Sequence, residues 1–413
     1  MSNSHYLLSM FNIRRVIIFL YGISICFGTF ALGGSSRNFT ISFILAILYI
    51  PLILLDPRQG LWNVIRKYKS YILPMFFFMV LIFIMNVFNA NEYDVPMIPI
   101  SIVSCFLFFI VMLLHNEYDN QAVHYCICGF CVGAIILSVL FLLDIGVYVE
   151  QGIMLDEEER MSMFGQNQNE LGLIMVCGIT LVLMAILKDR LRIGFARYLL
   201  ILPTLSMMSL LLASASRAAF TSLVLIVILI ILCHRTNGCF SQILFFAVSI
   251  GLCLYGLSYI ETSEVMYERI MLTLKEGNTS GRTEIWEALL PRLIETPIFG
   301  VGQTGYADVA HKELVGVTSV MHESGYSPHN VLIEVFAYTG IVGLSLVLIF
   351  WTRIVRDSMN IFKKLGNLMP LLLLIPIGIY ILTGQILTDK LAWLIYAFII
   401  VVYSNYKGAL CKR

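Results

Sequence analysis

The chain has 413 residues, of which 59% are hydrophobic and only 13% are charged, and its formal net charge is +1. This composition excludes an ordinary soluble globular protein, and the near-neutral charge suggests neither nucleic acid nor a strongly acidic surface as a partner. A hydrocarbon core roughly 30 Å thick needs about 20 apolar residues per helix, so the repeated apolar stretches predict a polytopic membrane protein built from helices.

Twelve apolar stretches follow one another from residue 16 almost to the end of the chain, and each predicts a transmembrane helix. No small-residue cleavage site is evident after the first stretch, so we expect an uncleaved helix there. The expected fold is an all-α polytopic membrane protein that forms one integral membrane domain over residues 1–413. The predicted spans are 16–33, 39–55, 71–89, 97–115, 124–148, 170–187, 199–214, 218–233, 243–260, 330–351, 368–387 and 391–406.

The orientation of these spans follows from Lys and Arg in the short loops, which concentrate on the cytoplasmic side of a membrane. Eighteen such residues fall on one side of the predicted bundle, whereas the short loops of the other side hold only Arg37, Arg160, Arg217 and Lys390. We therefore expect both termini to be cytoplasmic and the loops around 150–170 and 261–329 to lie outside.

The segment 261–329, between the ninth and tenth spans, is sixty-nine residues long. A loop of that length is usually functional or disordered. Its aromatic residues and the helical spacing of apolar side chains over 282–294 predict that it is ordered and partly helical. We expect Pro297 to end this helix and the glycines at 300, 302 and 305 to mark turns.

Arg217 lies in the sequence Ser214–Phe220, at a tight hairpin between the seventh and eighth spans. An Arg at that depth, flanked by small residues, is unfavourable unless it reaches the interface or pairs with an anion. Two interpretations stay open here: a ligand for phosphate, or an Arg at a helix end that extends to the membrane surface.

Arg282 and Trp286 lie near the start of the predicted loop helix, in the sequence Gly281-Arg282-Thr283-Glu284-Ile285-Trp286. A guanidinium group there would add its donors to the positive end of the helix dipole, which suits a pyrophosphate. The alternative is that Arg282 pairs with Glu284 or Glu287 on a solvated face.

His329 and Asn330 follow Ser327 and Pro328 at the start of the tenth span. The pattern predicts Ser327 as the N-cap and Pro328 as the first helical residue, which would put His329 in the first turn. The helix dipole would then keep the imidazole neutral near pH 7, as a general base on a sugar hydroxyl must be. A His that only helps to cap the helix is the alternative.

Amide side chains crowd the sequence Gly165-Gln166-Asn167-Gln168-Asn169-Glu170 before the sixth span. Amides of this kind hydrogen-bond sugar hydroxyls, and they equally cap helices. The spacing of Cys126, Cys128 and Cys131 is loosely that of a metal site, but these residues lie in an apolar run where free Cys packs as a small hydrophobe. We therefore expect no metal and no disulfide framework.

Taken together, these motifs resemble those of the O-antigen ligase and O-antigen polymerase superfamily of bacterial surface-polysaccharide assembly. The resemblance covers the second half of the chain, from Phe164 to about Ile349. It rests on the order and spacing of Ser216-Arg217, Gly281–Trp286, Phe299-Gly300-Val301-Gly302, and His329-Asn330 followed by Gly340 and Gly343.

The resemblance implies a glycosyltransferase of the bacterial inner membrane with its active site facing the periplasm. Such enzymes take a glycan from undecaprenyl pyrophosphate without metal, nucleotide or other cofactor. Arg217 and Arg282 would bind the pyrophosphate, His329 would activate the acceptor hydroxyl, and Gln168, Asn169, Trp286 and Asn330 are the further residues expected to contact substrate. Direct displacement would invert the anomeric centre.

The acceptor stays open between lipid A–core, used by ligases, and a lipid-linked repeat unit, used by polymerases; we favour the ligase. Relatives that glycosylate proteins are a further alternative. A lipid-oligosaccharide transporter also fits twelve helices. However, transporters place ionisable residues at the bilayer midplane and often show internal repeats. Here most span interiors are uncharged and the polar candidates gather on one side.

Overall fold

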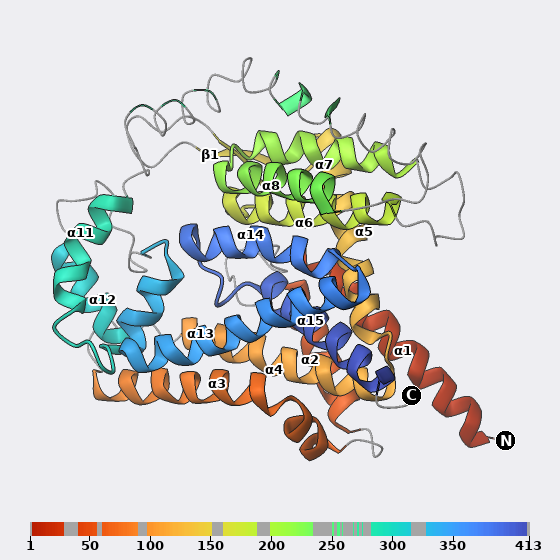
Figure 1. Ribbon diagram of the computed structural model, residues 1–413, viewed down its shortest axis with the longest axis horizontal. Helices are drawn as coiled ribbons and strands as arrows, with labels where there is room; N and C mark the ends of the chain where they lie inside the picture. The colour runs from red at the N-terminus through yellow and green to blue at the C-terminus, as the bar shows by residue number, and fades with distance from the viewer. Residues whose placement is uncertain are drawn as a thin grey trace.

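The computed structural model describes residues 2–28, 40–55, 60–89, 97–150, 160–187, 199–233, single positions between 250 and 275, 282–314 and 328–410. The chain is predominantly helical (Figure 1). Its helices are α1 (Ser2–Ile25), α2 (Ile41–Leu54), α3 (Leu61–Phe88), α4 (Met97–Tyr118), α5 (Ala122–Leu142), α6 (Gln168–Leu187), α7 (Ile201–Ala213), α8 (Arg217–Cys233), α11 (Arg282–Leu293), α12 (Gly302–Glu313), α13 (Val331–Leu365), α14 (Met369–Thr383) and α15 (Lys390–Leu410).

Six described helices are long and apolar enough to cross a membrane, namely α3, α4, α5, α6, α13 and α15. Four shorter helices, α2, α7, α8 and α14, are also apolar. These findings confirm a helical protein of membrane type. Most of the predicted ninth span, 243–260, lies outside the described residues.

Several predicted spans end earlier than expected, and a short pair of strands follows one of them. Helix α5 ends at Leu142 rather than continuing to 148, because Asp144 and Gly146 adopt positive φ angles of 57° and 75° and turn the chain. The next residues form β1 (Val147–Glu150), which pairs antiparallel with β2 (Arg160–Met163). Similarly, α14 ends at Thr383 instead of 387.

Helices α1 and α5 pack closely because glycines line their interface. A Cβ atom at Gly22 would lie 2.1 Å from the Cys126 carbonyl oxygen, and one at Gly129 would lie 2.0 Å from that of Phe19. Gly129 and Gly133 form a GxxxG pattern, which lets two backbones approach in the absence of a hydrophobic driving force between helices in lipid.

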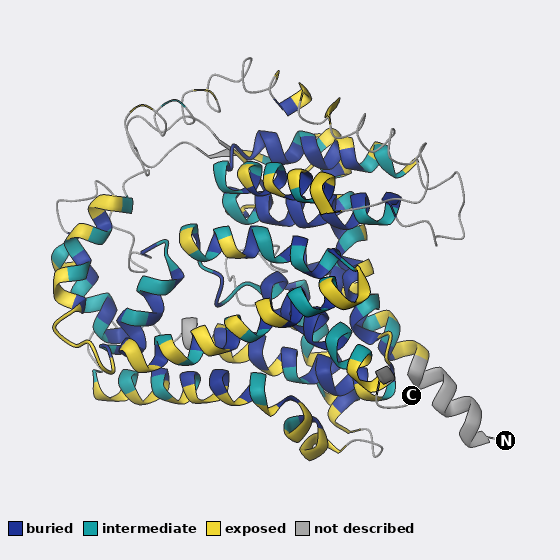
Figure 2. Cartoon of the chain, in the orientation of Figure 1, coloured by how far each residue is buried: buried dark blue, intermediate teal, exposed yellow. Residues whose placement is uncertain are grey.

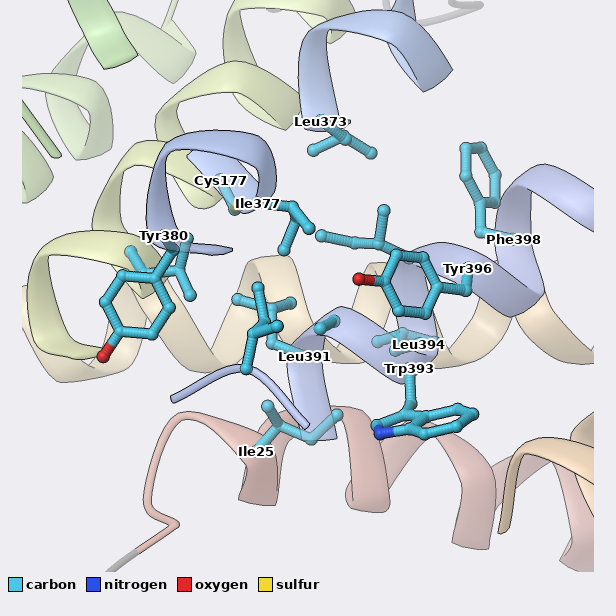
Figure 3. Close-up of a cluster of buried hydrophobic side chains, with 14 of the residues drawn as sticks. Ile25, Cys177, Leu373, Ile377, Tyr380, Leu391, Trp393, Leu394, Tyr396 and Phe398 are labelled. Atoms are coloured by element: carbon cyan, nitrogen blue, oxygen red, sulfur yellow. The ribbon is translucent and has the colours of Figure 1, made fainter. Parts of the chain in front are cut away.

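The bundle has a buried interior and an apolar exterior. In Figure 1, α6, α8 and α14 lie side by side, and α14 also packs against α13 and α15. Trp393 and Tyr396 of α15 meet Leu373 and Ile377 of α14 in a cluster of buried side chains (Figure 3). Along α3, by contrast, exposed apolar side chains such as Phe88 mark a lipid-facing surface (Figure 2).

Helix α13 is broken at Gly340, whose φ of 58° and ψ of −159° are not helical. The amides of Ile341 and Val342 donate instead to the carbonyl oxygens of Pro297 and Ile298, at 2.8 and 3.2 Å. The segment between α11 and α12 therefore satisfies the backbone groups that the break would leave unpaired. As a result, this segment is fixed against the first half of α13.

Helix α12 is fixed on its other side by α3. Gly302 has a φ of 71°, and the following amide, that of Gln303, donates to Asn86 Oδ1 at 2.6 Å. The prediction of turns is thus supported at Gly300 and Gly302, which both have positive φ, but it is wrong at Gly305, which lies within α12. Together these contacts hold α11 and α12 at the end of the bundle where α13 begins (Figure 1).

Candidate functional site

Arg217 is the first residue of α8, directly after a three-residue turn from α7. In this turn Ala215 has a φ of 49°, and Ser216 Oγ accepts from the amide of Ala219 and donates to Asn169 Oδ1 at 3.3 Å. The predicted hairpin is present. Arg217 therefore begins α8 at the positive end of its helix dipole, where an anion is stabilised.

Arg282 and His329 come together although 47 positions separate them in the sequence. Arg282 begins α11, and Trp286 one turn later donates from Nε1 to the carbonyl oxygen of Pro328 at 2.7 Å. This bond fastens α11 to the turn that carries His329. Arg282 is close enough for its charge to act on the imidazole of His329.

The imidazole of His329 is neutral at pH 7. Burial lowers its pKa first, and the positive charge of Arg282 lowers it further, to about 4. A neutral imidazole can accept a proton, whereas an imidazolium cannot. Burial and the charge of Arg282 both favour the neutral imidazole that a general base requires.

The predicted start of the helix at Pro328 is wrong by three residues. Helix α13 begins at Val331, and its N-cap is Asn330, whose Oδ1 accepts from the amides of Leu332 and Ile333 at 3.0 and 3.3 Å. Asn is among the strongest N-cap residues, which explains why the helix begins directly after Asn330. His329 thus precedes the helix and has a φ of 47°, a strained conformation that costs about 1–3 kcal/mol and is typical of functional sites.

The amide residues before α6 lie next to the hairpin that carries Arg217. Asn167 Oδ1 accepts from the amide of Asn169, so Asn167 caps the helix, while Asn169 receives the hydrogen bond from Ser216. Asn169 also lines a small pocket together with Ala218, Ser222 and Tyr380. Gln168 is buried, with 7% of its surface exposed.

Tyr380 is close both to the pocket that Asn169 lines and to Arg282. It lies within electrostatic range of Arg282 and of the carboxylates of Glu170 and Asp389. In Figure 3 its hydroxyl points away from the apolar cluster formed by Ile377 and its neighbours. Tyr380 thus lines the same small pocket as Asn169 and lies within electrostatic range of Arg282. Arg282 in turn acts on the imidazole of His329.

A polar cavity near this site was missed by reasoning from the sequence. It has a volume of about 180 Å³ and is lined by Gln166, Glu170, Thr388, Asp389 and Lys390, with Ile25, Gly28, Ile174 and Leu391 completing its wall. One signal was available in the sequence, since Asp389 and Lys390 place two opposite charges in the short turn between two apolar helices.

Arg282 and His329 place a group that can bind phosphate beside one that can accept a proton. Two guanidinium groups that each begin a helix provide forked donors for phosphate oxygens, and the neutral His329 provides a base. Within the described part of the chain, no three His, Cys, Asp or Glu side chains are grouped as metal ligands. Cys126, Cys128 and Cys131 are free thiols.

Comparison with known proteins gives one informative result. Among curated proteins, no match to this chain was found. A family model described as O-antigen ligase matches residues 202–348, which include Arg217, Arg282 and His329. This match supports a membrane enzyme of glycosyltransferase type with lipid-linked glycan substrates. The match to residues 202–348 bears out the resemblance to the O-antigen ligase superfamily that the motifs of this part of the chain show.

Proposed function

We propose that this protein transfers a glycan from undecaprenyl pyrophosphate to the hydroxyl group of an acceptor sugar, most simply lipid A–core, as an O-antigen ligase. The observation that carries the proposal is the neutral, half-buried His329 beside Arg282 within the segment that matches the ligase family. The protein would cross the bacterial inner membrane twelve times, with both ends of this chain in the cytoplasm and the site at the periplasmic face.

The proposed reaction is a single displacement at the anomeric carbon. His329 accepts the proton of the acceptor hydroxyl, the acceptor oxygen forms a bond to the anomeric carbon, and the bond from that carbon to the phosphate oxygen breaks. Arg217 and Arg282 stabilise the negative charge that develops on the leaving diphosphate. Attack opposite the leaving group inverts the anomeric configuration.

The donor requires no further activation, because a pyrophosphate is already a good leaving group. The protein mainly has to position two substrates and stabilise charge. Gln168, Asn169 and Trp286 would contact the glycans around the reacting atoms. Asn330 would contribute through its Nδ2, since its Oδ1 already accepts two hydrogen bonds from the helix. We expect transfer without an added metal or cofactor.

The first test is transfer in vitro, with purified protein, extracted lipid-linked donor and lipid A–core. We expect the wild type to remain active in excess chelator and His329→Ala to lose transfer while keeping the melting temperature of the wild type. Normal transfer by His329→Ala would contradict the role of this residue as the base. Loss of activity on chelation would instead show that a metal takes part.

Deletion of the gene separates the ligase from the two alternatives. Bare lipid A–core, with long glycan accumulating on undecaprenyl pyrophosphate, is the result expected for a ligase. Core that carries a single repeat unit would show a polymerase. An unchanged glycan profile despite intact polysaccharide synthesis would contradict both and favour a transporter. Complementation with wild type and with His329→Ala provides the matched pair.

A further inference from the structure

We propose that the polar cavity between α1, α6 and the start of α15 is a subsite for one sugar ring of a glycan substrate, recognised through its hydroxyl groups. This inference rests on the proposed function and deepens it, because it assigns residues that the family motifs do not include. Gln166, Glu170, Asp389 and Lys390 would form the subsite.

The cavity contains a buried acceptor atom with no partner. Gln166 is only 2% exposed, and its Nε2 donates to the carbonyl oxygen of Cys26 at 3.1 Å. That bond fixes the amide, yet its Oε1 has no hydrogen-bond partner among the described residues. A buried acceptor left unpaired destabilises the fold by about 1–3 kcal/mol, so its retention indicates a ligand that donates to it.

The carboxylate groups of the cavity also have oxygen atoms that make no hydrogen bond with described residues. The carboxylate of Glu170 makes no hydrogen bond or ion pair with any described residue, although it lines the cavity within electrostatic range of Lys390 and Asp389. Asp389 Oδ1 accepts from the amides of Leu391 and Ala392 at 2.7 and 3.4 Å, which leaves Oδ2 for other partners. The ammonium group of Lys390 donates to Ser42 Oγ. The atoms of the cavity that make no hydrogen bond with described residues are therefore mostly acceptors.

This chemistry selects the class of ligand. Acceptor atoms require a ligand rich in donors, and the two carboxylates against one ammonium group would repel a phosphate. A sugar ring presents several hydroxyl donors on a compact body. The cavity far exceeds the roughly 10–15 Å³ that a single water needs, yet it is below the about 300–1,000 Å³ of pockets for drug-sized ligands. One ring of a longer glycan fits between these limits.

The position of the cavity connects it with the reacting groups. Glu170 directly follows Asn169, whose side chain is bonded to Ser216 next to Arg217. Tyr380 lies within electrostatic range of Glu170 and Asp389 on one side and of Arg282 on the other. A glycan whose diphosphate or acceptor hydroxyl lies near the arginines and His329 would thus extend into the acidic cavity.

The test measures KM and kcat separately for the donor and the acceptor, using undecaprenyl-pyrophosphate-linked glycan and lipid A–core extracted from the deletion strain. The variants are Glu170→Gln and Gln166→Leu, with Glu295→Gln as a matched control, because Glu295 is exposed and paired with Arg292. We expect each cavity variant to raise one of the two KM values about ten- to a hundredfold, with a much smaller change in kcat.

The substrate whose KM rises identifies the source of the ring: the donor KM for a donor sugar, the acceptor KM for an acceptor sugar. Glu170→Gln replaces a carboxylate that makes no hydrogen bond or ion pair with a described residue, so the melting temperature of the variant should equal or exceed that of the wild type, whereas a structural role would lower it. Unchanged KM values for both substrates in both variants would overturn the subsite. If His329→Ala is inactive in the same assay, the proposed function is retained in that case.

Discussion

At the scale of single residues, the protonation of His329 makes a prediction about pH. Transfer requires the neutral imidazole, and burial together with Arg282 holds the pKa of His329 at about 4. The acidic limb of the kcat/KM profile should therefore lie near pH 4, well below the ordinary value of about 6.5. Replacing Arg282 with Gln removes a positive neighbour, which favours the imidazolium and raises this pKa.

We accordingly expect Arg282→Gln to lower the rate and to move the acidic limb to higher pH, to a value between about 4 and 6.5, because burial remains. The shape of the profile separates this effect from simple loss of donor binding, which would lower the whole curve without moving its limb. Arg292→Gln is the control, since Arg292 is exposed and paired with Glu295 and Glu313.

Arg217 tests whether the site needs a forked donor or only a positive charge. Lys keeps the charge but lacks the planar pair of N–H donors that matches a phosphate. We expect Arg217→Lys to raise the donor KM about tenfold and Arg217→Ala to raise it further, with little change in the acceptor KM. Equal donor KM values for Arg217→Lys and the wild type would show that charge alone is sufficient.

At the scale of elements, the break in α13 depends on Gly340. Its φ and ψ lie in a region that only glycine adopts readily, and an added Cβ would lie 2.3 Å from the Ile298 backbone. Gly340→Ala should therefore destabilise the protein by roughly 2 kcal/mol or more and release the segment 297–302 from α13. A lower melting temperature and faster proteolysis within 282–314 would be the measured results.

Gly378→Ala supplies the control for this prediction. Gly378 lies within α14, and no atom comes within 4 Å of the position that its Cβ would occupy. Because Ala is favoured over Gly in a helix by about 0.5–1 kcal/mol, this variant should be as stable as the wild type or more so. Equal behaviour of the two variants would contradict the proposed role of the break.

The elements also show where hydropathy is a sufficient guide and where it fails. Apolar runs predicted the positions of most described helices, because burial in lipid imposes one requirement on every span. They could not predict β1 and β2, because that pairing depends on a turn at Asp144 and Gly146 inside an apolar run. Nor could they predict the break at Gly340, because the carbonyl groups that make it possible belong to residues 297 and 298.

At the scale of the whole molecule, only those residues of the candidate site that lie in local sequence motifs could be predicted. Arg217, Arg282 and His329 each stand at a recognisable helix start, and the motifs that contain them also carry the family resemblance. The cavity joins Gln166 and Glu170 with Asp389 and Lys390, more than 200 positions further along the chain. Only the packing of α6 against α14, which leads into α15, relates these segments, so no local pattern could reveal their contact.

The orientation of the whole molecule gives the last prediction. The part of α13 after Gly340 spans about 37 Å at 1.5 Å per residue, enough to cross a core roughly 30 Å thick. Lys312 on α12 and Lys363 near the end of α13 are both exposed and lie at opposite ends of this helix (Figure 1). In a background without native cysteines, a membrane-impermeant maleimide added to spheroplasts should label Lys312→Cys. Lys363→Cys should react only after lysis, because the positive-inside rule puts that end in the cytoplasm. The reverse pattern would place Arg282 and His329 on the cytoplasmic side, away from a periplasmic acceptor, and the proposed ligase reaction would then be untenable.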